Sequence, residues 1–150
     1  MVKKLAIACD HAALDMKAEV IKYLEALGYE CEDYGTYTKD SCNYPDYAEK
    51  VCDAVNGGAQ ELGILICGTG IGMSMAANKC KGIRAALCSD TFSARFTRLH
   101  NDANVLCMGA RTIGAGLACD IAETFVTTGF EGGRHQTRID MVMALENKRK

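Results

Sequence analysis

The segment ELGILIC, residues 61–67, runs directly into GTGIG, residues 68–72, and this junction decides the fold. Almost every position of the first segment is apolar, which is typical of a strand whose two faces are both covered in a parallel sheet. The second segment holds three glycines, and a helical pattern follows over residues 72–79. The sequence therefore predicts a strand, a tight glycine loop and a helix in direct succession.

The same succession of short apolar runs and helical patterns continues in both directions from this junction. Alternation of this kind is typical of an open parallel sheet with helices on both faces. The 150 residues fit one domain, since no linker, repeat or low-complexity tract interrupts them. Strands are predicted over residues 4–9, 29–33, 61–67, 83–88 and 104–109, and helices over 14–27, 45–56, 72–79, 91–99, 114–128 and 136–150.

Composition and charge exclude several classes of protein. Apolar residues make up 49% of the chain and charged residues 24%, as in an ordinary globular protein, and the formal net charge is -2. This balance lacks the basic surplus of a nucleic-acid-binding protein. The first apolar run meets Asp10 and His11 too early to form a secretory signal or a membrane span. We therefore expect a cytoplasmic protein that binds neither nucleic acid nor membrane.

The nine cysteines do not form a disulfide or zinc pattern. Their number is odd, no two follow C-x-x-C spacing, and none pairs with a nearby histidine at zinc-ligand spacing. Several end apolar runs, so we expect most of them to be reduced thiols that fill the core. No metal site is predicted.

Ligands of open parallel sheets bind beyond the carboxyl ends of the strands, so the residues after each predicted strand are candidates for a site. Asp10 and His11 follow the first strand, Cys67 and the glycines follow the third, and Arg111 follows the fifth. Asp10 alternatively caps the next helix, and His11 is then simply solvated. Arg111 could equally form a surface ion pair.

Three interpretations compete for CGTGIG, residues 67–72. Dinucleotide binding is disfavoured, because the loop lacks G-x-G-x-x-G spacing and follows the third strand rather than the first. A cradle for a phosphate or an oxyanion suits the spacing, because glycines let backbone N–H groups converge on a ligand. The field that binds an anion would also favour a thiolate at Cys67. The remaining interpretation is a plain turn after a core cysteine.

Two further groups could act on such an anion. His100, followed by Asn101, could serve as a general acid or base, although a histidine at a helix end is commonly just exposed. Arg134 and Arg138 are four residues apart on a predicted helical face, where two guanidiniums can grip a phosphate or form a solvated basic face. Together with the thiol, these groups indicate chemistry on a phosphorylated small molecule.

Six motifs in order carry a resemblance to a known family. They are CDH at 9–11, NYPDYA at 43–48, GILICGTGIGMSMAANK at 63–79, GIRAALCSD at 82–90, RLHNDANVLCMGAR at 98–111 and EGGRHQTR at 131–138. With them the chain resembles the type B ribose-5-phosphate isomerases, a family shared with the galactose-6-phosphate isomerase subunits. The resemblance covers nearly the whole chain. It implies a three-layer αβα Rossmann-like fold with a five-stranded parallel sheet, and an aldose–ketose isomerase that uses no metal or cofactor.

The resemblance also assigns roles to residues. It implies Cys67 as the base, His100 in ring opening, and a homodimer or dimer of dimers with the active site at the subunit interface. His100, Asn101 and Arg111 are then expected to serve the neighbouring subunit's Cys67. The chain departs from the family pattern at Ala13 and Met73, which leaves the sugar preference open. The implied substrate-binding positions are Asp10, His11, Tyr44, Gly68, Thr69, Gly70, Ile71, Gly72, Asn101, Arg111, Arg134 and Arg138.

The resulting hypothesis is interconversion of ribose 5-phosphate and ribulose 5-phosphate in the pentose phosphate pathway. Cys67 moves a proton between C2 and C1 through a cis-enediolate, Thr69 steadies the oxyanion, and Asp10 orients the sugar hydroxyls. Three alternatives stay open. They are an isomerase of a hexose 6-phosphate such as allose or galactose 6-phosphate, a subunit that needs a different partner chain, and a non-catalytic nucleotide-binding domain.

Overall fold

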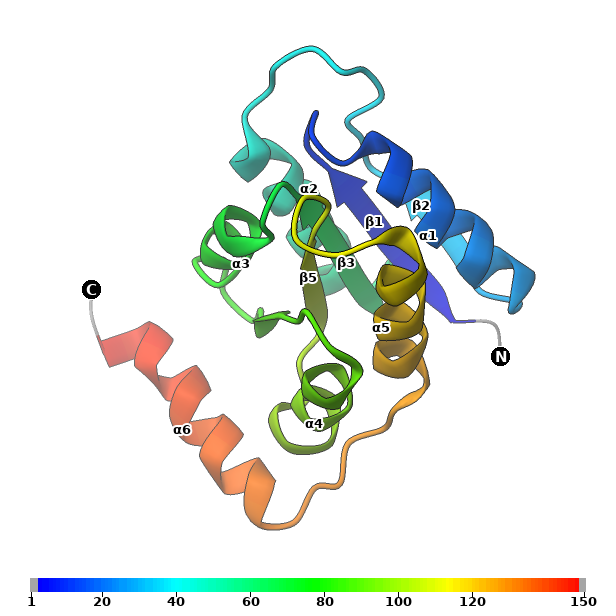
Figure 1. Cartoon of the computed structure of the whole chain (residues 1–150). Coiled ribbons are helices and arrows are strands. Elements are labelled where there is room, and N and C mark those ends of the chain that lie inside the picture. Colours follow the sequence, from blue (N-terminus) through cyan, green and yellow to red (C-terminus); the bar gives the residue numbers. More distant parts are fainter. Residues whose placement is uncertain (1–2, 149–150) are drawn as a thin grey trace.

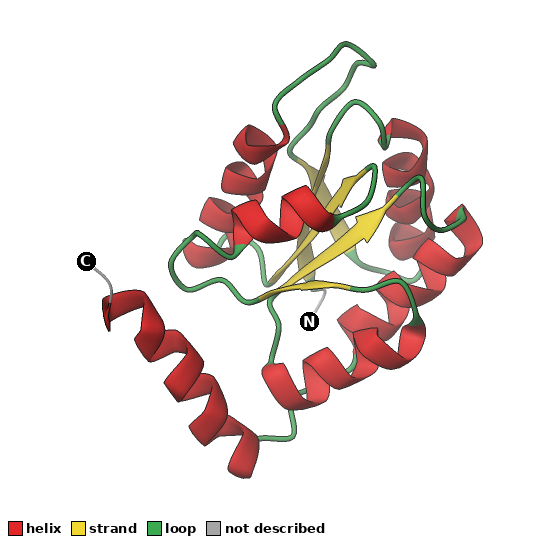
Figure 2. Ribbon diagram, turned by 60° about the vertical axis from the view of Figure 1, so that its left-hand side comes forward, coloured by secondary structure: helices red, strands yellow, loops and turns green. Residues whose placement is uncertain are grey.

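The computed structural model describes residues 3–148, which form a five-stranded parallel sheet between two layers of helices (Figures 1 and 2). The expected three-layer αβα fold is confirmed. The strand order is β2-β1-β3-β5-β4. The strands are β1 (Lys4–Cys9), β2 (Glu30–Asp33), β3 (Leu62–Cys67), β4 (Ala85–Leu87) and β5 (Val105–Gly109). The helices are α1 (Leu14–Ala26), α2 (Tyr44–Asn56), α3 (Ile71–Ala77), α4 (Thr91–Asn101), α5 (Ala115–Thr127) and α6 (Arg134–Lys148).

Alternate residues of the central strands point into two separate cores. Ile64 and Ile66 of β3 pack with α1, α4 and α5 on one face of the sheet. Leu65 and Cys67 of the same strand pack with α2 and α3 on the other face. Every residue of β3 is buried, which explains why its sequence is apolar throughout.

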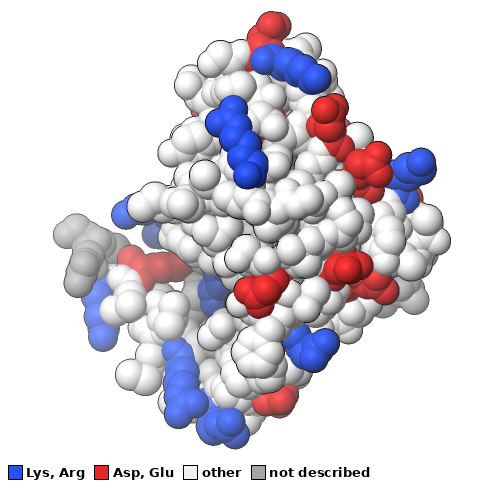
Figure 3. All heavy atoms as spheres, in the orientation of Figure 1, with Lys and Arg blue, Asp and Glu red and all other residues white. Residues whose placement is uncertain are grey.

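Helix α6 differs from the other helices because it projects away from the sheet (Figure 1). Its contacts with the body are few and involve mainly α4. Met141, Val142 and Leu145 on this helix are more than half exposed. Acidic and basic side chains are interspersed on the face of the molecule drawn in Figure 3. Among the described residues, no helix combines the length and the apolar character needed to cross a bilayer.

The strand order fixes where a ligand can bind. The chain leaves β1 toward β2 on one side, and then returns to β3 on the other side of β1. The carboxyl ends of β1 and β3 therefore flank a switch point, where the connecting loops diverge and leave a crevice. Asp10 follows β1 at this crevice and Cys67 ends β3 there.

Most element boundaries lie within two residues of the sequence-based predictions, and three of the differences bear on the surroundings of His100. Strand β4 has only three residues, because the N–H of Arg84 donates to the Asn104 side chain instead of continuing a ladder. Helix α4 continues through His100 and ends at Asn101, and its C-cap Asp102 is left-handed with φ 44°. Helix α6 begins at Arg134, two residues earlier than expected. The last two residues of the predicted final helix lie outside the described residues.

Candidate active site

The loop after β3 holds the sulfur of Cys67 against a backbone N–H. Gly70 lies in the left-handed region with φ 79°, and its N–H donates to Cys67 Sγ at 3.1 Å. An N–H that donates to sulfur stabilises negative charge on that sulfur. The next N–H, of Ile71, donates to the hydroxyl oxygen of Thr69 at 3.2 Å. The glycine loop thus wraps its donors around the thiol and the threonine.

Glycines let this loop approach β5 with no side chain between them. A Cβ on Gly109 would lie 2.6 Å from the backbone carbon of Thr69, and a Cβ on Gly70 would lie 2.8 Å from the backbone carbon of Met108. Two hydrogen bonds close the contact, from Ala110 N–H to the Cys67 carbonyl and from Arg111 N–H to the Gly68 carbonyl. The loop and the turn after β5 therefore form one unit.

Arg111 lies over the glycine loop of its own chain. A Cβ on Gly68 would meet the Arg111 guanidinium nitrogen Nη1 at 3.4 Å, so this glycine makes room for the arginine. The expectation that Arg111 serves a neighbouring subunit's Cys67 stays a prediction. Within one chain, the backbone hydrogen bonds between the two loops tie Arg111 to Gly68.

The residues after β1 lie on the other side of the crevice. Asp10 is buried, its N–H donates to the Ile66 carbonyl, and its carboxylate accepts from the N–H of Ala12 at 2.9 Å. The N–H of Cys42 donates to His11 Nδ1 at 3.3 Å. Since Nδ1 accepts, neutral His11 carries its proton on Nε2, which is then a donor.

Tyr44 and Gly72 join the two sides of this crevice. A Cβ on Gly72 would lie 2.7 Å from the ring of Tyr44, so the tyrosine packs directly on the first turn of α3. The sequence-predicted residues that share the carboxyl edge of the sheet are Asp10, His11, Tyr44, Cys67, Gly68, Thr69, Gly70, Ile71, Gly72 and Arg111.

Other thiols in the core lack these surroundings. Burial raises the pKa of Cys9 and that of Cys88 to about 11. Burial also raises the pKa of Cys107 well above the ordinary thiol value. These sulfurs therefore stay protonated near neutral pH, as expected of core cysteines.

The remaining sequence-predicted residues gather at the opposite edge of the sheet. Helix α4 begins at the carboxyl edge of the sheet and runs back along it. Its 11 residues span about 16 Å, so the helix ends at the amino edge. His100 and Asn101 end this helix and line a cavity of about 860 Å³ together with Arg138 of α6. Arg134 is exposed at the start of α6. Cys67 is not in the wall of this cavity, so one chain does not bring Cys67 and His100 together.

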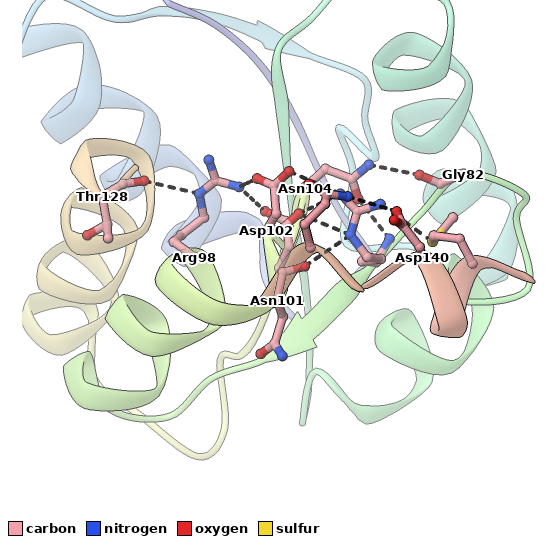
Figure 4. Close-up of polar contacts among 11 residues, drawn as sticks. Gly82, Arg98, Asn101, Asp102, Asn104, Thr128 and Asp140 are labelled. Atoms are coloured by element: carbon pink, nitrogen blue, oxygen red, sulfur yellow. Dashed lines mark hydrogen bonds and ion pairs between the residues drawn. The ribbon is translucent and has the colours of Figure 1, made fainter. Parts of the chain in front are cut away.

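A partly buried ion-pair network fixes the end of α4 (Figure 4). Arg98 donates to the Asp102 carboxylate at 2.9 Å and to the Thr128 carbonyl at 3.2 Å. Arg84 donates to the Asp102 carbonyl at 2.7 Å and to the Asn101 carbonyl at 3.0 Å. The Arg84 guanidinium thus caps the carbonyls at the end of the helix, and Arg98 holds the Asp102 side chain, which together keep His100 and Asn101 in a fixed turn.

Comparison with known proteins identifies the family of the chain. Residues 5–142 match the family described as Ribose/Galactose Isomerase. The chain belongs to this family. It is 46% identical to ribose-5-phosphate isomerase B of Escherichia coli over 148 residues, 99% of each chain. It is 52% identical to a putative sugar phosphate isomerase of Bacillus subtilis, over 97% of this chain and 98% of that one.

Solved structures of the family share the fold. The Clostridium thermocellum ribose-5-phosphate isomerase B superposes with a TM-score of 0.96 at 46% identity, covering 98% of this chain and 99% of that chain. The Mycoplasma genitalium enzyme, solved with bound ribulose 5-phosphate, has a TM-score of 0.93 at 40% identity, covering 99% of both chains.

Two residues beside His100 were missed in the sequence analysis. Glu131 Oε2 lies 3.2 Å from His135 Nε2 and 3.8 Å from His100 Nε2. The two imidazole rings stack, with their centroids 4.1 Å apart. The four-residue spacing of Glu131 and His135 in EGGRHQTR could have indicated a shared helical face, but their neighbour His100 depends on how α6 meets α4.

Gly70→Ala tests whether the glycine loop depends on its close approach to β5. The new Cβ would lie 2.5 Å from Leu87 Cδ1 and would force a left-handed alanine. We expect the free energy of unfolding, measured by urea denaturation, to fall by roughly 2–5 kcal/mol. Gly116→Ala is the control, because no atom lies within 4 Å of its added Cβ. Equal midpoints for the two variants would contradict the packing described above.

Proposed function

We propose that the chain is a ribose-5-phosphate isomerase formed by a single domain over residues 1–150. The observation that carries the proposal is the hydrogen bond from Gly70 N–H to Cys67 Sγ, at the carboxyl end of β3 in a chain of this family. Relatives named ribose-5-phosphate isomerase B at 46% and 41% identity over nearly the whole chain support the substrate. So does the Mycoplasma genitalium structure that holds ribulose 5-phosphate.

The chemistry needs a base that serves two neighbouring carbons. The Cys67 thiolate removes the proton from C2 of the open aldose, and the electron pair forms the C1–C2 double bond of a cis-enediolate. The same thiol then returns the proton to C1, and the hydroxyl proton of the C2 oxygen passes to the C1 oxygen, so that C2 becomes the ketone and C1 carries a hydroxyl. Thr69 and the N–H groups of the loop stabilise the negative oxygen. One such donor contributes roughly 3–4 kcal/mol to transition-state stabilisation.

The phosphate binds away from the reacting carbons. His11 offers its Nε2–H as a donor, because the N–H of Cys42 occupies Nδ1. Arg134 and Arg138 of the chain that supplies His100, one turn apart on α6, give forked cationic donors that match phosphate oxygens. Fixing the phosphate holds C1 and C2 at the thiol in one geometry.

The active site is shared by two chains of a homodimer, or of a dimer of dimers. His100 and Asn101 lie at the amino edge of the sheet while Cys67 lies at the carboxyl edge, which supports a site completed by the partner chain. His100 of one chain opens the sugar ring by moving a proton at the ring oxygen, and Asn101 binds a hydroxyl beside it.

The departures from the family pattern lie beneath the site. Ala13 is 1% exposed and Met73 is fully buried, each in one of the two cores. Both therefore act on the packing of the turn after His11 and of α3, and neither replaces a group that moves a proton. A pentose phosphate remains the substrate we propose.

Ketose formation from ribose 5-phosphate, allose 6-phosphate and galactose 6-phosphate, each assayed with a chelator present, tests the proposed reaction. We expect fast conversion of the pentose, and Cys67→Ser should keep the fold but lose most of the turnover because a hydroxyl is a far weaker base than a thiolate. Cys107→Ser is the matched control, a buried thiol whose pKa is raised by burial. Conversion of a hexose phosphate alone would show that the substrate is a hexose phosphate rather than a pentose phosphate. Near-normal turnover of Cys67→Ser would show that Cys67 is not the base.

Arg138→Ala should chiefly raise KM for ribose 5-phosphate and leave kcat within a few-fold. A phosphate contact remote from the reacting carbons binds ground and transition states alike, so its loss appears in KM. Steady-state kinetics with Lys148→Ala as a charge control on the same helix measures the effect. An unchanged KM would show that Arg138 does not bind the phosphate.

A further inference from the structure

Two imidazole rings stack where α6 meets α4. His100 lies in the last turn of α4, and His135 lies in the first turn of α6. The rings are nearly parallel, with an interplanar angle of 14° and centroids 4.1 Å apart. Although α6 makes few contacts with the body of the molecule, this stack gives it a direct contact with the ring of His100.

His135 is the more fixed member of the stack. Its side chain is only 7% exposed, whereas that of His100 is 35% exposed. Glu131 Oε2 lies 3.2 Å from His135 Nε2, and the N–H of Glu131 donates to the Leu99 carbonyl at 3.1 Å. The segment that leads into α6 is thereby tied to α4 itself. A buried ring thus backs a partly exposed one.

A second aromatic neighbour restricts the ring of His100. Phe96, one turn earlier on α4, meets this ring edge-on, with centroids 5.0 Å apart and an interplanar angle of 74°. Phe92 in turn stacks on Phe96, with centroids 4.4 Å apart. Stacked and edge-on ring pairs are both favourable, and rotation of the imidazole about its Cβ–Cγ bond would disturb both of its ring contacts. The two neighbours therefore hold His100 in one orientation.

The stack also connects His100 to the cations of α6. His100, His135 and Arg138 line the same cavity of about 860 Å³. Arg134 directly precedes His135, and Arg138 follows it by three residues on the same helix. The proposed phosphate donors and the proposed ring-opening group are thus joined through one side chain. Because Nε2 of His135 is buried, this atom cannot contact the sugar itself.

We propose that His135 is a positioning residue for ring opening. Its ring holds the His100 imidazole in the orientation that moves a proton at the ring oxygen of the sugar. This inference rests on the proposed function, which assigns ring opening to His100. Without the stack, His100 reaches the ring oxygen in a productive geometry less often, and a misplacement of about 1 Å can cost roughly 100-fold in rate. Proton transfer at the other chain's Cys67 does not depend on the stack.

Two reactions separate ring opening from proton transfer. Conversion of ribose 5-phosphate to the ketose requires both steps. Exchange of a C1 hydrogen of ribulose 5-phosphate with D₂O, followed by ¹H NMR, requires only proton transfer, because a 2-ketose whose C5 oxygen carries the phosphate cannot close a furanose ring. We expect His135→Leu to lower kcat for conversion about tenfold or more, and to leave the exchange rate within about twofold of the wild type.

His135→Phe is the conservative variant, because a phenyl ring can still stack on His100. We expect it to convert ribose 5-phosphate at close to the wild-type rate. A merely space-filling role would not distinguish the flat phenyl ring from leucine in this way. Thr137→Leu, at an exposed position of the same helix, is the matched control and should resemble the wild type in both reactions.

Three results would overturn the proposal. They are a normal conversion rate in His135→Leu, an equal loss of conversion and exchange in that variant, and a conversion rate in His135→Phe as low as that of His135→Leu. Equal loss would show that His135 only supports the fold. A wild-type enzyme that neither converts ribose 5-phosphate nor exchanges the hydrogen of ribulose 5-phosphate would instead refute the proposed function itself.

Discussion

The contact between the backbone of Thr69 and Gly109 is the constraint on which the site depends. Strands β3 and β5 are paired so that Cys67 lies opposite Gly109, and the absence of a side chain there lets the loop fold back over the end of β5. This return brings Gly70 N–H to the sulfur of Cys67, and two hydrogen bonds from the turn after β5 hold it there. The sulfur of Cys67 is thereby placed against a backbone donor in the glycine loop.

Chain topology underlies our proposal that two chains share the site. A helix that follows a parallel strand runs back to the amino edge of the sheet, so its last residues lie one strand length from the loop that precedes it. Cys67 and His100 occupy these two ends. The projecting helix α6, with its exposed apolar side chains, provides a surface that a second chain can cover, and our proposal of a shared site follows from this geometry.

Local patterns predicted most of the fold and the grouping of candidate residues at the carboxyl edge of the sheet. The apolar run 61–67 and the glycines after it were sufficient for the strand, the loop and the carboxyl-edge group, because strand direction and sheet type place them together. Residues whose neighbours depend on long-range packing were less predictable. Arg111 lies over its own chain's loop, the end of α4 depends on Arg84 and Arg98, and the neighbours of His100 depend on how α6 meets α4.

Mixing two inactive variants tests the shared site most directly. Cys67→Ser and His100→Asn are refolded together in equal amounts, so that about half of the dimers are hybrids with one intact site of two. A shared site predicts recovery of about a quarter of the wild-type activity on ribose 5-phosphate, because the intact cysteine and the intact histidine come from different chains. A mixture no more active than the two variants alone would contradict the account.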